Sequence, residues 1–174
     1  MTAALTTTRR RWLAATACAA WAVPAFSEGE QRRDWPRGRA TPSVQLPMLD
    51  GGAWTLAGVR GRPVLLNFWA TWCEPCRAEM PSLQQLATRH QAQGLQVLAI
   101  NFREADSTVR RFMATTALGL PVLLDADGGA AKAFGVHTFP STVGVDRAGK
   151  ARYVVTGEVD WAGPQAERWI EALR

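Results

Sequence analysis

The chain has 174 residues, enough for one domain with an extension, and 47% of them are hydrophobic and 20% charged. This composition excludes a collagen-like, fibrous or wholly disordered chain, and no apolar run reaches the roughly 18 residues of a membrane-spanning helix. The net charge is +5, but residues 1–40 hold seven Arg and three acidic side chains, so the excess lies near the N-terminus. Nucleic-acid binding needs a basic stripe on the folded surface and is not expected.

Residues 1–26 have the three parts of a secretory signal, and we call this segment the leader. Residues 9–11 are all Arg, an apolar stretch runs from residue 12 to 26, and small residues precede a cleavage point after Ala25. The arginines also fit the twin-arginine pattern, so the ordinary secretory route and the twin-arginine route stay open. An uncleaved membrane anchor and a lipoprotein modified at Cys18 are the further alternatives.

Residues 27–42 are polar and interrupted by Gly and Pro, which predicts a linker before a folded domain over residues 43–174. The elements expected in that domain are a hairpin over 44–56, a strand over 64–69, a helix from 73 to about 93, a strand over 95–101, a helix over 108–116, a strand over 121–124, a short helix ending at 134, a second hairpin over 142–156 and a last helix over 161–173. Helices alternate with strands, which predicts an α/β fold with a mixed central sheet flanked by helices.

Two cysteines, Cys73 and Cys76, lie outside the leader. They are too few for a disulfide-stapled scaffold, and a structural zinc site would need four ligands, whereas His90 and His137 stand alone. A reversible dithiol remains. Cys73 lies at the expected helix start, where unpaired N–H groups and the helix dipole stabilise a thiolate, so it is the expected nucleophile. Cys76, one turn further, is its shielded partner, and neither a metal nor a cofactor besides this redox-active pair is expected.

Two residues separate the cysteines. Pro75 suits the first turn of a helix, where its missing N–H is not needed. Glu74 places a negative charge near the Cys73 sulfur and so raises the free energy of the thiolate. That effect favours a reductant over a strong oxidant.

The run from Asn67 to Pro81, Asn-Phe-Trp-Ala-Thr-Trp-Cys-Glu-Pro-Cys-Arg-Ala-Glu-Met-Pro, resembles the signature of the TlpA-like/ResA-like family. Proteins of this family are exported thiol–disulfide oxidoreductases with a thioredoxin-like fold. The resemblance extends over about residues 42–174. It implies a thioredoxin-like domain with an N-terminal β-hairpin and a central insertion at about residues 101–120.

The resemblance also implies roles beyond the cysteines. Pro140 matches the family's cis-proline, which faces the cysteine pair and pairs with the substrate backbone; the alternative is a trans proline at a strand start. Phe139 departs from the smaller or β-branched residue usual before this proline, which leaves substrate preference open. Glu79 matches a functional acid, and a partly buried carboxylate there can accept the Cys76 proton, whereas the alternative is a solvated helix side chain.

Four other side chains lie close to these motifs. We expect Trp69 in the core and Trp72 at the rim of the substrate groove. Arg77 is interpreted as a solvated helix residue. His137 lies two residues before the phenylalanine of the proline loop and is a minor candidate for a ligand or a proton relay.

The expected function is that of an extracytoplasmic, periplasmic protein-disulfide reductase, a monomer working through Cys73 and Cys76. The resemblance implies electrons from a membrane thiol transporter, and as clients either the Cys-x-x-Cys-His sites of apocytochrome c or the cysteines of copper sites. A disulfide oxidase or isomerase is one alternative, against which Glu74 counts. The other is a copper-binding assembly module using Cys73, Cys76 and His137, although copper chaperones of this fold place three residues between their cysteines.

Overall fold

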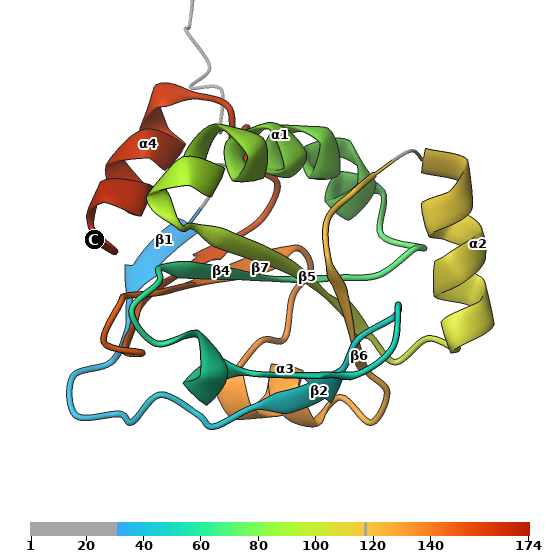
Figure 1. Cartoon of the computed structure of the whole chain (residues 1–174), viewed down its shortest axis with the longest axis horizontal. Coiled ribbons are helices and arrows are strands. Elements are labelled where there is room, and N and C mark those ends of the chain that lie inside the picture. Colours follow the sequence, from blue (N-terminus) through green and yellow to red (C-terminus); the bar gives the residue numbers. More distant parts are fainter. Residues whose placement is uncertain (1–30, 117) are drawn as a thin grey trace, which may run out of the picture.

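The computed structural model describes residues 31–116 and 118–174 (Figure 1). The leader, with its predicted cleavage point, lies outside the described residues. Within those two ranges, no helix combines the length and the apolar character needed to cross a lipid bilayer.

The centre of the fold is a six-stranded mixed sheet in the order β1-β8-β7-β4-β5-β6. Its strands are β1 (Gln31–Asp34), β4 (Val64–Trp69), β5 (Gln96–Phe102), β6 (Val122–Asp125), β7 (Ser141–Val145) and β8 (Ala151–Thr156). Strands β4, β5 and β6 are parallel, while β7, β8 and β1 add to the other side of β4 in antiparallel pairs. A separate two-stranded hairpin joins β2 (Gln45–Pro47) to β3 (Ala53–Thr55), as predicted.

Helices cover both faces of the sheet (Figure 1). They are α1 (Glu74–His90), α2 (Asp106–Thr116), α3 (Gly129–Phe134) and α4 (Pro164–Glu171), with 3₁₀ turns at Leu56–Val59 and Gln91–Gln93. Helices α1 and α4 lie on one face, α3 and the β2–β3 hairpin on the other, and α2 lies beyond β6 (Figure 1). The predicted α/β architecture is confirmed, and α2 occupies the predicted central insertion.

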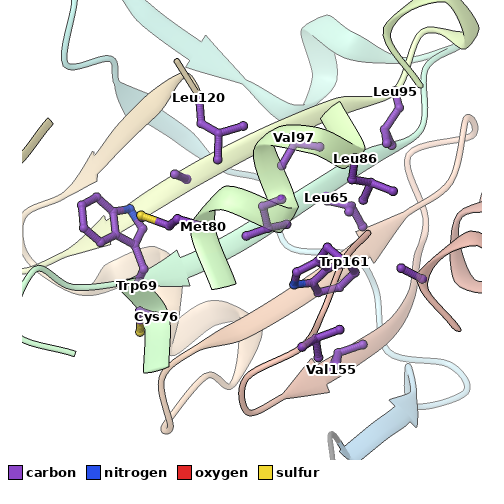
Figure 2. Packing of buried hydrophobic residues seen from close by; sticks show 14 of the residues in the cluster. Leu65, Trp69, Cys76, Met80, Leu86, Leu95, Val97, Leu120, Val155 and Trp161 are labelled. Carbon is purple, nitrogen blue, oxygen red and sulfur yellow. The ribbon is translucent and has the colours of Figure 1, made fainter. Parts of the chain in front are cut away.

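Strand β4 shows why the core has two halves. Successive side chains of a strand point to opposite faces, so Leu65 and Trp69 pack under α1, whereas Leu66 and Phe68 pack against the α3 side. All six residues of β4 are buried because both faces are covered. Figure 2 shows the α1 side of this core, with Trp69 and Cys76 at one end of the helix and Leu86 at the other.

The structure differs from the linker predicted over residues 27–42. Residues 31–34 form β1, the edge strand paired with β8. Trp35 is buried against Phe134, with ring centroids 6.0 Å apart, and the Arg39 guanidinium lies 4.5 Å from the Trp35 ring centroid. The side chains of residues 32–34 are all exposed, so this strand has no alternation of apolar and polar residues, and for this reason the polar sequence concealed it.

The last helix also begins later than predicted. It starts at Pro164 in place of residue 161, and Trp161 precedes it as a fully buried side chain. The backbone N–H of Trp161 donates to Ser82 Oγ at 3.0 Å. Trp161 therefore joins the segment before α4 to helix α1, and this contact contributes to the site described next.

Candidate active site

The cysteine pair lies where β4 leads into α1. Cys73 is the N-cap of α1, and its Sγ accepts the backbone N–H of Cys76 at 3.3 Å. The two residues form a disulfide, with Cα atoms 5.3 Å apart. Cys73 is 6% exposed and Cys76 is fully buried, which is the order of exposure predicted for an attacking and a resolving sulfur. Pro75 lies in the first turn, as predicted.

Glu79 is buried one turn beyond Cys76, so the alternative of a solvated helix side chain is wrong. Its Oε1 accepts from Asn67 Nδ2 at 2.7 Å. Its Oε2 accepts the Val159 N–H at 3.1 Å and Trp161 Nε1 at 3.2 Å. Burial raises the pKa of Glu79 to about 7, although the three hydrogen bonds act to lower it. This carboxyl group can therefore exchange a proton near neutral pH.

Asn67 connects Glu79 to the strand that follows the proline loop. Its Nδ2 also donates to Thr142 Oγ1 at 3.0 Å, and Thr142 is its neighbour across the β4–β7 pair. The Asn67 side chain is buried, and its Oδ1 has no partner among the described residues. Sequence reasoning missed both residues. The available signal was a single amide within the otherwise apolar run of β4.

The proline loop meets the cysteine loop through aromatic rings. The Phe139–Pro140 peptide is cis, as the resemblance implied. Phe139 packs on Phe102 with ring centroids 4.8 Å apart and meets the Trp72 ring edge-on at 6.1 Å. Trp72 is 65% exposed and is the one large hydrophobic side chain exposed in the described part of the chain. The three rings form an aromatic rim beside the cysteine pair.

Glu104 is a further acidic residue at the site, and sequence reasoning missed it. Its Oε2 accepts the Thr71 N–H at 2.7 Å and Asn101 Nδ2 at 2.8 Å, and its Oε1 accepts the Thr71 hydroxyl at 2.5 Å. The available signal was its place just after β5, because the carboxyl ends of parallel strands meet at one edge of a sheet.

The remaining residues that the sequence singled out lie either in the core or at the surface. Trp69 is fully buried against Phe112, with ring centroids 5.2 Å apart, so its predicted core position is confirmed. Glu74, Arg77 and His137 are exposed. In the described ranges, no three His, Cys, Asp or Glu side chains form a group that could hold a metal ion. The copper-module alternative thus finds no support.

Comparison with known proteins identifies the family. A family model described as the AhpC/TSA family matches residues 37–154. The chain belongs to the AhpC/TSA family. The thiol-disulfide oxidoreductase ResA of Geobacillus thermodenitrificans is 37% identical to it over 120 residues, which are 69% of this chain and 69% of that protein.

Solved structures agree with this assignment. A DsbE thiol:disulfide interchange protein from Chlorobium tepidum superimposes with a TM-score of 0.73 at 30% identity, covering 79% of this chain and 97% of that one. A secreted Mycobacterium tuberculosis disulfide oxidoreductase, homologous to DsbE, gives a TM-score of 0.61 at 27% identity over 75% of this chain and 96% of that one. This AhpC/TSA-family chain therefore has a thioredoxin-like fold and is a thiol–disulfide oxidoreductase, with Cys73 and Cys76 as its dithiol pair.

Proposed function

We propose that this chain is an exported reductase of protein disulfides. One observation carries the proposal: Cys73 lies at the N-cap of α1 beside the exposed Trp72, while Cys76 and Glu79 lie buried behind it. The N-cap position stabilises a Cys73 thiolate through the N–H groups of the first turn. The buried partner is then protected until a client is bound.

Thiol–disulfide exchange with a client needs no cofactor besides the dithiol. The Cys73 thiolate attacks one sulfur of a client disulfide; that bond breaks, the other client sulfur leaves as a thiolate, and a mixed disulfide forms. Cys76 then loses its proton to Glu79 and attacks the Cys73 sulfur. The second client sulfur leaves, and the Cys73–Cys76 disulfide forms. Two electrons have passed to the client, so an external dithiol must reduce the pair again.

Other residues of the site are proposed to contact the client or to adjust the reduction potential of the dithiol. The backbone before Pro140 pairs with the client chain, while Trp72 and Phe139 contact side chains next to its disulfide. Glu74 is exposed at the first turn, where its charge opposes the thiolate and so favours a reducing potential. Pro75 keeps the first turn rigid without leaving a donor unpaired.

The leader and the family support the proposed compartment and partners. The leader predicts export to the periplasm, retained or cleaved, and the M. tuberculosis relative is described as secreted. In an oxidising compartment the dithiol needs an external supply of electrons, and the proposed donor is the membrane thiol transporter that the family resemblance implies. The proposed clients are the Cys-x-x-Cys-His sites of apocytochrome c or copper-site cysteines, and nucleic acid is not a partner.

The reduction potential tests the direction of electron flow. It is measured on the chain from residue 27 onward by equilibration in defined thiol–disulfide buffers. A value near or below about −230 mV supports a reductase. A value near about −120 mV, typical of strong oxidants, would overturn the proposal together with the role assigned to Glu74. The Cys73→Ser variant is the control and should form no mixed disulfide, because its remaining thiol, that of Cys76, is fully buried.

A further inference from the structure

Glu104 binds the turn that leads into the cysteine pair. The turn is short: the Cys73 N–H donates to the Ala70 carbonyl at 3.2 Å, so residues 70–73 fold back on themselves. Thr71, inside this turn, directs both its backbone N–H and its hydroxyl to the Glu104 carboxylate, at 2.7 and 2.5 Å. The turn is therefore held by a side chain outside its own loop.

The carboxylate is itself fixed to the sheet. Asn101, the penultimate residue of β5, donates its Nδ2 to Glu104 Oε2 at 2.8 Å, and Asn101 lies opposite Trp69 in the β4–β5 pair. The residue before the carboxylate, Arg103, has a φ of 56°, in the left-handed region that non-glycine residues rarely adopt. A backbone conformation of this kind persists where the surrounding structure holds it, and such positions cluster at functional sites.

We infer that Glu104 is a positioning residue for thiol–disulfide exchange: through Thr71 it holds the turn before Cys73, and so the direction from which the Cys73 sulfur attacks. It acts by its hydrogen bonds and not by its charge. The inference rests on the proposed role of Cys73 as the attacking sulfur. Small displacements of a reacting atom matter, because a misplacement of about 1 Å can slow a reaction about a hundredfold.

Two substitutions of Glu104 distinguish the effect of its hydrogen bonds from the effect of its negative charge. In Glu104→Gln, the amide oxygen can take the place of Oε2 and accept from Thr71 N–H and Asn101, while the amide nitrogen takes the place of Oε1 and donates to the Thr71 hydroxyl. All three contacts survive and the charge is lost. In Glu104→Ala, all three contacts are lost. Glu167→Ala is a matched control, since Glu167 likewise joins two elements, accepting from Arg89 at 2.5 Å and contacting His90 at 2.8 Å.

The measurement is the single-turnover rate of the reduced chain with oxidised glutathione as a function of pH, at a temperature below each variant's melting transition. Glu104→Ala should lower the rate about tenfold or more at every pH. Glu104→Gln and the Glu167→Ala control should stay within about threefold of the unmodified chain. A Glu104→Ala rate equal to that of the unmodified chain overturns the inference. So does a Glu104→Gln rate as low as that of Glu104→Ala, because the charge would then be responsible.

A double-mutant cycle tests whether Glu104 acts through Thr71. Thr71→Val removes the hydroxyl contact, and its effect on the rate should be smaller in the Glu104→Ala background than in the unmodified chain. Additive effects would contradict the inference. Failure of the proposed function looks different: in that case Cys73→Ser would react as fast as the unmodified chain, whatever the residue at position 104.

Discussion

At the scale of single residues, burial changes the acid–base properties of Glu79. It is 2% exposed and accepts three hydrogen bonds, yet burial still raises its pKa from 4.5 to about 7. The folded chain therefore binds this proton more tightly than the unfolded chain does. Between those two values the folded state holds more protons, so the stability that this group contributes falls as the pH rises.

Glu79→Gln should remove this dependence on pH. The variant should gain stability relative to the unmodified chain as the pH rises from 4.5 to about 7 and keep that gain above it. At about 1.4 kcal/mol per unit of pKa the gain has an upper limit of about 3.5 kcal/mol. The side-chain amide of Asn67 can rotate by half a turn. Its Oδ1, which has no partner among the described residues, then accepts a hydrogen bond from the amide nitrogen introduced at position 79.

Urea unfolding at a series of pH values measures this difference. Glu74→Gln is the control, since Glu74 is exposed and its substitution should leave the curve unchanged. The same Glu79→Gln variant should lengthen the lifetime of the mixed disulfide, because the base for Cys76 is lost. A variant whose stability follows the pH exactly as the unmodified chain does would show that Glu79 titrates normally in the folded state.

At the scale of elements, the segment before the predicted domain belongs to the fold. Strand β1 extends the sheet beyond β8, and Trp35 follows it into the core on the α3 side. Trp35 Nε1 donates to the Arg39 carbonyl at 3.0 Å, so the indole is both buried and hydrogen-bonded. The segment therefore forms the edge strand of the sheet and packs on the domain, so it is not a linker.

Trp35→Ala tests that conclusion. Truncation of a buried tryptophan should lower the free energy of unfolding by about 3 kcal/mol, from lost burial and the cavity that remains. Arg37→Ala, in the same segment but exposed, should change it by less than about 0.5 kcal/mol. Chemical denaturation monitored by far-ultraviolet circular dichroism checks both variants. Equal stability of Trp35→Ala and the unmodified chain would mean that this segment does not pack on the domain in solution.

At the scale of the whole molecule, the described surface offers little for self-association. Trp72 is the only large hydrophobic side chain exposed in the described ranges, and it lies at the aromatic rim of the site. Stable dimers need a contiguous apolar patch, which one indole does not supply. The chain without its leader should sediment as a monomer of constant mass over a wide range of micromolar concentrations. A mass that rises toward that of a dimer would contradict this expectation, and Trp72→Ala would then show whether the rim is the contact.

Local patterns were enough to predict most of the elements and the reacting pair. The apolar run of β4, the glycines and prolines between segments and the periodicity of α1 are signals carried by neighbouring residues. The cysteine spacing with a helix start is equally local, and the family resemblance added Pro140 and Glu79. Strand β1 was missed because its residues are polar and only their pairing with β8, distant in the sequence, makes them a strand.

The sequence by itself determined the α/β class, the dithiol chemistry and the family, because each is written in residues that lie close together in the chain. Only the tertiary structure decided the surroundings of those residues. It buried Glu79 under Asn67 and Trp161, and it brought Glu104 from the end of β5 to the turn before Cys73. These contacts join residues up to 82 positions apart, and sheet order and helix packing, which no local pattern contains, create them.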